Sequence, residues 1–262
     1  MPGAIEIAQF FPCDPRAELE GEPRGCIHSW DISTGVDGPG TRLVLFLSGC
    51  PLRCRYCQNP DTWARKGDEE SMAEVAELVR HYRPFISLSG GGLTLSGGEP
   101  LLQAEFCAAI LADAKRAGLH TALDTSGFLG QRASDALLDD TDLVLLDIKA
   151  GSEAAHRRLT LRPLAPTLRF AQRLAQRRDR VWLRYVLVPG WNDDPSEVEA
   201  VATFAAGLGN VERVDLLPFH TLGESKFEEL GLAFPLAGNP TPTADQVAAA
   251  LAIFRRQGLP AH

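Results

Sequence analysis

The chain has 262 residues, of which 45% are hydrophobic and 23% are charged. These proportions are typical of globular proteins and exclude a disordered or fibrous chain. Lys and Arg number 26 against 34 Asp and Glu, so the net charge is −8, which argues against broad binding to nucleic acids or to an anionic membrane surface. The sequence has neither an apolar run long enough to span a membrane nor the pattern of a secretory signal. We therefore expect a cytoplasmic protein with reduced thiols.

Strands and helices are expected to alternate along most of the chain. Residues 1–24 are punctuated by Pro and Glu, and we expect a loosely structured extension before one core domain of residues 25–262. Apolar runs predict strands at 43–47, 93–95, 121–123, 143–148, 181–188 and 214–219. Helical periodicity predicts helices at about 71–83, 103–117, 134–138, 167–178, 196–208 and 244–257.

Local signals set some of the helix ends. Ser71 and Glu74 fit a capping box, and Pro84 is expected to stop that helix. Gly118 is the expected C-cap of the next helix. The alternation of strands and helices predicts an α/β fold with a parallel sheet. About six βα units are too few for a closed eight-fold barrel, so we expect a partial (β/α)6 TIM-like barrel, with a doubly wound sheet as the alternative.

Polar and reactive residues follow the C-terminal ends of all six predicted strands. Parallel α/β folds place their active sites on that face. Six loops carrying such residues are hard to attribute to packing alone, so we expect the functional site there. The segments are Cys50, residues 96–99, 124–126, 147–149, 189–190 and His220.

Three of the six cysteines form a C-x3-C-x2-C motif, made of Cys50, Cys54 and Cys57. Three thiolates on one loop can hold three irons of a cubane cluster and leave the fourth iron open to a small molecule. The residue pattern alone also leaves open a zinc site, an electron-transfer cluster or ordinary core cysteines. The remaining residues, Cys13, Cys26 and Cys107, have no partner pattern and are expected to be ordinary thiols.

The motif, with Tyr56 before its third cysteine, resembles the radical S-adenosylmethionine (SAM) superfamily. Further stretches resemble the branch of that superfamily that activates glycyl radical enzymes, in particular pyruvate formate-lyase. The resemblance covers about residues 25–258 and is carried by segments 28–30, 34–40, 57–63, 89–99, 123–127, 142–149, 184–191 and 216–220.

The resemblance implies an oxidoreductase that reductively cleaves SAM at one [4Fe-4S] cluster and installs a glycyl radical on pyruvate formate-lyase. Its partners would be the glycyl radical loop of that enzyme and reduced flavodoxin or ferredoxin as electron donor. Residues 58–90 contain no cysteine, so a second cluster, as in activases of some other glycyl radical enzymes, is not expected. Another glycyl radical enzyme, a small-molecule substrate, or a non-catalytic iron–sulfur or zinc protein are the alternatives.

The resemblance also assigns roles around SAM. Gly97 and Gly98, with Glu99, would hold the methionyl ammonium through close backbone approach, although a Gly-rich turn is often only a turn. Asp147 and Lys149 would contact the ammonium and the ribose or carboxylate, although an Asp-x-Lys pair can be a plain ion pair. Other expected contacts of the cofactor are Tyr56, Gln58, where relatives commonly carry His, Ile148, Arg184 for the carboxylate, and His220 beside the adenine and ribose.

Two further roles follow from the same resemblance. Asp124, Thr125 and Asp147 would surround a monovalent cation, although Asp124 could equally cap a helix. Asp37, in the segment Asp-Gly-Pro-Gly, would help to hold the incoming substrate peptide, although such a segment is normally just a turn. Arg184 and His220 could also have purely structural roles.

Overall fold

The computed structural model describes residues 23–66 and 69–262, and these form one eight-stranded sheet in the order β3-β1-β2-β4-β5-β6-β7-β8. Six strands, from β2 to β8 without β3, run parallel, whereas β1 is antiparallel to β2 and β3 is antiparallel to β1. The strands are β1 (Arg24–Thr34), β2 (Thr41–Leu47), β3 (Glu69–Ser71), β4 (Gly92–Gly97), β5 (His120–Thr125), β6 (Leu143–Asp147), β7 (Val181–Leu187) and β8 (Val211–Pro218).

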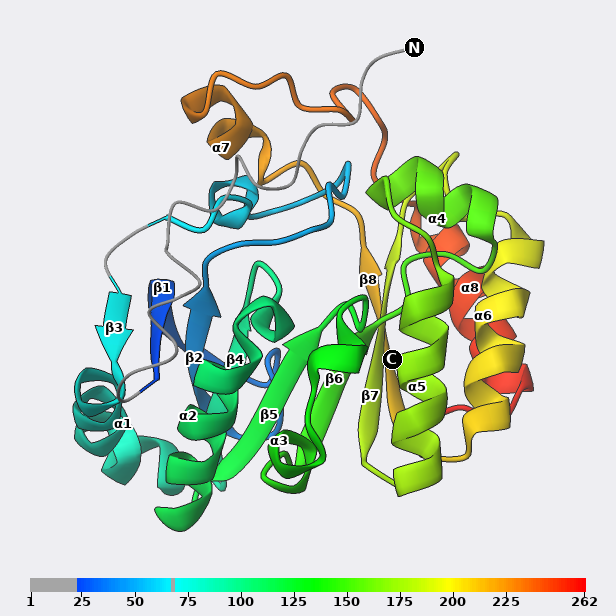
Figure 1. Cartoon of the computed structure of the whole chain (residues 1–262). Helices are drawn as coiled ribbons and strands as arrows, with labels where there is room; N and C mark the ends of the chain where they lie inside the picture. The colour runs from blue at the N-terminus through cyan, green and yellow to red at the C-terminus, as the bar shows by residue number, and fades with distance from the viewer. Residues whose placement is uncertain (1–22, 67–68) are drawn as a thin grey trace.

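Most of the helices lie between successive parallel strands in the chain and pack along the outside of the sheet, and the last two follow the final strand (Figure 1). They are α1 (Met72–Ser87), α2 (Ala104–Arg116), α3 (Asp135–Asp139), α4 (Glu153–Thr160), α5 (Ala165–Arg177), α6 (Pro195–Leu208), α7 (Glu224–Glu229) and α8 (Ala244–Arg256). Short 3₁₀ helices lie at Pro60–Thr62, Pro100–Gln103 and Gly130–Arg132. No helix in the described part of the chain is long and apolar enough to cross a membrane.

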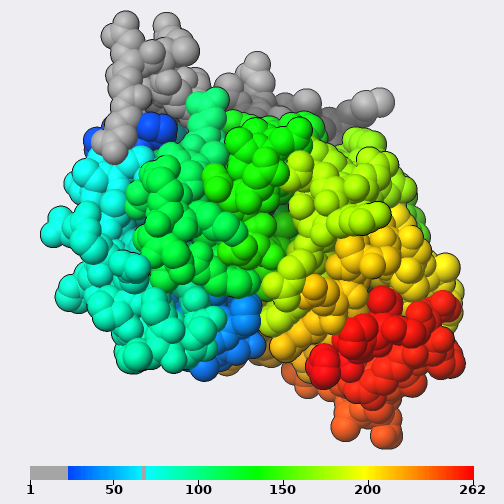
Figure 2. Space-filling model, turned by 90° about the horizontal axis from the view of Figure 1, so that it is seen from below, coloured from blue at the N-terminus to red at the C-terminus, as the bar shows by residue number. Residues whose placement is uncertain are grey.

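The order of the strands identifies a partial barrel and excludes the doubly wound alternative. The six parallel strands lie side by side in the order in which they occur in the chain, whereas a doubly wound sheet reverses its strand order part-way. The sheet does not close, because β3 and β8 end the order. Viewed from below, the segments follow one another from cyan through yellow to red, and the blue N-terminal strand region reaches the surface between the two ends of this arc (Figure 2). The expected partial (β/α)6 barrel is therefore confirmed.

Several local expectations are also confirmed. Ser71 Oγ accepts from the Glu74 amide at 3.3 Å, and the Glu74 carboxylate accepts from the Ser71 amide at 2.7 Å, so the capping box is complete. Gly118 follows the C-cap of α2 with φ +75°. The Cys107 side chain is buried in the hydrophobic core, where its Sγ donates to the Pro100 carbonyl at 3.2 Å.

The expectation that Pro84 stops α1 was wrong, because the helix continues through it to Ser87. Pro84 lacks an amide for the Arg80 carbonyl, and both residues are exposed, so water can serve that carbonyl instead. The edge strands β1 and β3 and the helices α4 and α7 were not expected. The expected extension of residues 1–24 lies outside the described residues apart from Pro23 and Arg24, and Arg24 already begins β1.

A buried arginine links the beginnings of the first parallel strands. Arg42 on β2 is fully buried and donates to Thr94 Oγ1 at 2.9 Å, to the Leu93 carbonyl and to the His120 carbonyl at 3.2 Å. Burial lowers the pKa of Arg42 to about 10. The guanidinium thus connects β2, β4 and β5 near their N-terminal ends.

We predict that Arg42→Ala lowers the free energy of unfolding by about 3 kcal/mol, because it leaves several buried acceptors without donors. Arg116→Ala is the control, since its side chain is 71% exposed and its loss is expected to cost less than about 0.5 kcal/mol. Urea unfolding followed by circular dichroism measures both values. Equal stability of the two variants would contradict the role given to Arg42.

Candidate functional site

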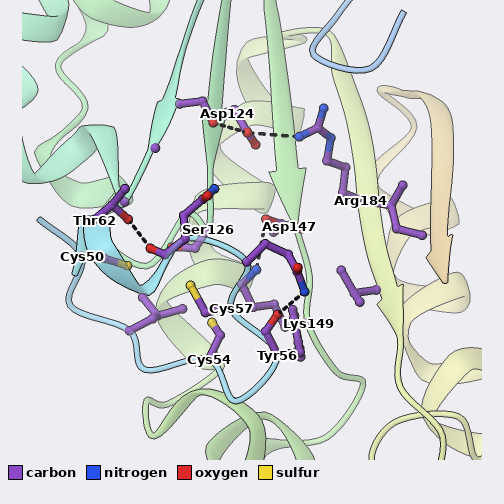
Figure 3. Close-up of a pocket in the computed structure, with 18 of the residues that line it drawn as sticks. Cys50, Cys54, Tyr56, Cys57, Thr62, Asp124, Ser126, Asp147, Lys149 and Arg184 are labelled. Atoms are coloured by element: carbon purple, nitrogen blue, oxygen red, sulfur yellow. Dashed lines mark hydrogen bonds and ion pairs between the residues drawn. The ribbon is translucent and has the colours of Figure 1, made fainter. Parts of the chain in front are cut away.

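A cavity of about 470 Å³ opens inside the barrel at the carboxyl ends of the strands. Its size is in the usual range for small-molecule and cofactor sites. Figure 3 shows the three motif cysteines at one end of this cavity and Asp124 with Arg184 toward the other. Of the residues expected in the site, the cavity is lined by Cys50, Cys54, Tyr56, Cys57, Gln58, Gly97, Gly98, Asp124, Thr125, Asp147, Lys149, Arg184 and His220.

The cysteine loop is held from outside by the C-terminus of α4. The amides of Arg53 and Arg55 donate to the carbonyls of Thr160 and Leu159 at 3.0 and 2.9 Å. These carbonyls belong to the last turn of the helix, where no intrahelical donor remains. Leu161, the C-cap, has φ +60° and turns the chain away from the helix axis. The helix end and the loop therefore satisfy each other's backbone groups.

Of the three motif cysteines, Cys54 is buried, and Cys50 and Cys57 are half-buried. Burial raises the pKa of Cys50 and Cys57 and raises the pKa of Cys54 to about 12. Metal ligation requires thiolates, so bound cations must supply the charge that makes deprotonation favourable. The loop thus has the chemical character of a metal site rather than of a nucleophile.

The ligand set fits a cluster better than a single ion. In residues 23–66 and 69–262, no three Cys, His, Asp or Glu side chains converge closely enough to hold one metal ion. A cubane places each cysteine on a different iron, so its ligands stand further apart than those of a tetrahedral zinc. Cys50, Cys54 and Cys57 all face the cavity, where a ligand could reach the remaining iron.

The Gly-rich segment after β4 packs directly against the chain that leads into the cysteine loop. Gly97 has φ +110°, and a Cβ on Gly98 would lie 2.3 Å from the Gly49 carbonyl oxygen. The amides of Gly98 and Glu99 donate to the carbonyls of Leu47 and Gly49 at 2.9 and 2.8 Å. Only glycine fits these positions, because the backbone of this segment packs directly against the backbone of Leu47 and Gly49.

Glu99 itself lies behind the cavity wall. Its buried carboxylate accepts from Thr125 Oγ1 at 2.5 Å, from the Ser126 amide at 3.0 Å and from Ser126 Oγ. Burial raises the pKa of Glu99, against the effect of the hydrogen bonds from Ser126 and Thr125. Glu99 therefore joins the loop after β4 to the loop after β5, and its carboxylate faces these hydroxyls rather than the cavity.

Asp147 and Lys149 form an ion pair at the end of β6, with 3.0 Å between Oδ2 and Nζ. The ammonium also lies 5.5 Å from the centroid of the Tyr56 ring. Burial alone disfavours a charged Lys149, but Asp147, Tyr56 and Cys54 together outweigh this effect, and the pKa of Lys149 is raised. Two opposite charges thus face the cavity beside the cysteine loop.

A second group of charges spans the barrel. Arg184 on β7 donates to Asp124 Oδ2 at 3.0 Å (Figure 3) and lies 3.5 Å from Asp37 Oδ1. Asp124 also accepts from Ser96 Oγ at 2.6 Å, and it caps no helix because it lies within β5. The backbone carbonyl of Asp37 accepts from Thr94 Oγ1 at 2.7 Å. This network ties the turn between β1 and β2 to the interior of the barrel.

The remaining expected residues fall into different environments. His220 is exposed and lines the cavity. Gln58 Nε2 donates to the carbonyls of Tyr56 and His220 at 3.1 Å each, and its Oε1 is buried with no partner among the described residues. Ile148 is buried in the hydrophobic core and does not line the cavity. Apolar lining residues that the sequence did not single out are Val36, Leu52, Trp63, Val186 and Leu217.

The side chains expected around a monovalent cation are already engaged with one another or with neighbours. Asp124 is paired with Arg184, and Asp147 is paired with Lys149. The Thr125 hydroxyl donates to Glu99. A cation bound here would therefore have to share these carboxylates with the two basic side chains.

Comparison with known proteins gives consistent matches. Residues 44–205 match the Radical SAM superfamily. A pyruvate formate-lyase 1-activating enzyme of Escherichia coli K12 is 41% identical over 237 residues, which is 89% of this chain and 96% of the relative. A pyruvate formate-lyase-activating enzyme of Staphylococcus aureus USA300 is 42% identical over 235 residues, which is 87% of this chain and 94% of the relative.

Solved structures agree with this assignment. A domain of a pyruvate-formate lyase-activating enzyme from Bacteroides vulgatus ATCC 8482 is 28% identical, with a TM-score of 0.56 over 66% of this chain and 98% of that domain. Coproporphyrinogen III oxidase of Escherichia coli, a radical SAM enzyme at 13% identity, shares the fold with a TM-score of 0.51 over 82% of this chain and 52% of that one. The chain therefore belongs to the radical SAM superfamily and, within it, to the family of pyruvate formate-lyase-activating enzymes.

Proposed function

We propose that this protein activates a pyruvate formate-lyase by removing a hydrogen atom from one glycine Cα of that enzyme. The observation that carries the proposal is the set of three thiols, Cys50, Cys54 and Cys57, that line one cavity. When bound, a reduced [4Fe-4S] cluster and SAM supply the radical that takes the hydrogen. The chain itself would bind and orient these groups and exclude water.

Several residues would orient SAM. The backbone at Gly97 and Gly98 lines the cavity, which suits the methionyl ammonium, and Asp147 would add a carboxylate. Lys149 and Arg184 would face the carboxylate or the ribose, and each already has an acidic partner that holds its charge in place. The remaining contacts would come from Tyr56, Gln58 and His220, all of which line the cavity.

Two other assignments remain part of the proposal. Asp37 would help to hold the substrate peptide; it does not itself line the cavity, but its carboxylate lies 3.5 Å from Arg184, which does. A monovalent cation would be held between Asp124, Thr125 and Asp147. We also propose a cytoplasmic location and a reduced flavodoxin or ferredoxin as electron donor, since reduced thiols and low-potential electrons are available together in that compartment.

We predict that Cys54→Ala abolishes SAM cleavage and reduces iron and acid-labile sulfide well below about four of each per chain, because one of the three cluster ligands is lost. The control is Cys107→Ala, which removes a buried thiol of α2 that does not line the cavity. Anaerobic reconstitution with iron and sulfide analysis, followed by chromatography of 5′-deoxyadenosine, measures both effects. If the Cys54 variant cleaved SAM at the wild-type level, the cluster would not take part in the reaction.

We predict that the reduced, cluster-loaded protein, incubated with SAM and a pyruvate formate-lyase, gives the doublet of a glycyl radical in the electron paramagnetic resonance spectrum. Replacing the target glycine of the formate-lyase by Ala should remove the doublet, because the glycine that carries the radical is then absent. If 5′-deoxyadenosine forms and no doublet appears, SAM cleavage stands and the proposed target is wrong.

We predict that Glu99→Gln raises the KM for SAM about tenfold while the iron content stays unchanged. The Gln side chain has only one acceptor oxygen, so either the Thr125 or the Ser126 hydroxyl loses its hydrogen bond. A loss of about 1.4 kcal/mol in binding free energy corresponds to a factor of ten. Glu105→Gln is the matched control, because Glu105 is exposed on α2. An unchanged KM in the Glu99 variant would show that the contact between the two loops does not shape the SAM site.

A further inference from the structure

Two arginines gather over one indole ring next to the cysteine loop. The guanidinium carbons of Arg55 and Arg158 lie 5.4 and 4.7 Å from the centroid of the Trp191 ring. Arg55 belongs to the cysteine motif, Arg158 to α4 and Trp191 to the loop that follows β7. Three segments that are distant in sequence therefore build one basic surface, which we call the Trp191 platform and define by these three residues.

The platform is held rigidly. Arg158 Nη2 donates to the carbonyls of Gly190 and Trp191 at 3.2 and 2.6 Å, and Arg55 Nε donates to the Arg158 carbonyl at 2.8 Å. Trp191 Nε1 donates to Asn239 Oδ1 at 3.2 Å, which fixes the plane of the ring. Little side-chain entropy is left to lose when another molecule binds here.

The platform is connected to the cluster ligands through the backbone. Arg55 is the residue after Cys54, and its amide donates to the Leu159 carbonyl of α4 at 2.9 Å. Arg162, just after this helix, donates to the Pro51 carbonyl of the same loop at 2.6 Å. Arg55, Arg158 and Trp191 do not line the cavity, so a molecule seated on the platform would touch the loop that holds the cluster without entering the cavity.

The charges of the platform are not neutralised within the described part of the chain. Neither Arg55, Arg158 nor Arg162 has a carboxylate within ion-pair distance there, whereas the adjacent Arg157 is paired with Glu153. Holding two guanidinium groups over one ring without a counter-charge is electrostatically unfavourable. This arrangement stands out in a chain whose net charge is −8. A partner that supplies carboxylates would relieve the repulsion.

We propose that the Trp191 platform docks the acidic face of the one-electron carrier protein that reduces the cluster. This inference rests on the proposed function, since it names where the electron enters. In the docked complex the carrier is oxidised by one electron and the cluster is reduced by one, and no covalent bond forms or breaks. Electron-transfer encounters are typically small and governed by charge, which suits a compact basic surface beside the cluster loop.

The test compares two arginines that each lie over an indole ring, of which, among the described residues, only Arg213 has a carboxylate partner, Asp215. Arg158→Gln removes a guanidinium over Trp191, and Arg213→Gln removes one that lies 4.6 Å from the Trp182 ring near the start of β8. The cluster-loaded variants are titrated with an acidic flavodoxin, and with a ferredoxin in parallel, at low and at high salt. We expect Arg158→Gln to raise the Kd several-fold and Arg158→Glu about tenfold at low salt, and Arg213→Gln to leave the Kd unchanged. Arg158→Lys should restore most of the affinity.

A second measurement separates docking from the reaction. Arg158 does not line the cavity, so SAM cleavage driven by dithionite should be unchanged in Arg158→Gln, whereas cleavage driven by the reduced carrier should fall in parallel with affinity. Equal weakening by Arg213→Gln, or no weakening by Arg158→Glu in a folded, cluster-loaded protein, would overturn the docking site. Reduced activation of pyruvate formate-lyase under dithionite would assign the platform to that enzyme instead. Failure of wild-type protein to cleave SAM with dithionite would instead overturn the proposed function.

Discussion

Desolvation of three thiols in one eight-residue loop, which raises the pKa of each, is the constraint on which the rest of the site depends. A buried thiol resists ionisation, so the loop can act as a ligand only if metal charge replaces the lost hydration. The fold contributes the geometry: the last carbonyls of α4 bind the amides of Arg53 and Arg55, and the Cys50 amide donates to the Trp63 carbonyl at 3.1 Å. The loop is therefore fixed by backbone groups that need no particular side chain.

The charged side chains of the cavity are arranged in pairs rather than singly. Asp147 is paired with Lys149, and Arg184 lies between Asp124 and Asp37. Such pairing keeps each charge in place in a region of low dielectric, where an isolated charge would be costly. A zwitterionic ligand with an ammonium and a carboxylate can exchange partners with these pairs without leaving any charge unmatched. The cavity is thus preorganised for a ligand such as SAM.

Charge is also distributed between the two sides of the cysteine loop. The cavity is lined by carboxylates as well as basic groups, whereas Arg55, Arg158 and Arg162 do not line it. Because Arg55 follows Cys54 directly, a protein bound on the Trp191 platform and a ligand bound in the cavity would both contact the loop that carries the three sulfurs. The electron carrier and the substrate peptide would therefore not have to bind at the same surface.

Much of the molecule could be predicted from local sequence patterns. The six parallel strands appear as apolar runs because they are buried on both faces, and the cysteine spacing indicates a cluster because ligand number and distance are set within eight residues. Residues at the ends of neighbouring parallel strands meet at one edge, so the order of the motifs in the chain already placed Cys50, Asp124 and Asp147 together. These features depend on contacts that are short in sequence or repeated regularly along it.

Only the tertiary structure decided the features that rest on single long-range contacts. Strand β1 is half exposed and polar, so no apolar run marks it, and it forms because the edge of β2 is available for pairing. Glu99 looked like a cofactor ligand, yet its carboxylate faces Thr125 and Ser126. The contact between Asp37 and Arg184 joins residues 147 positions apart, and the meeting of Arg55 and Arg158 over Trp191 has no signature in any one segment. Such contacts depend on how the barrel curves, and local periodicity carries no information about that.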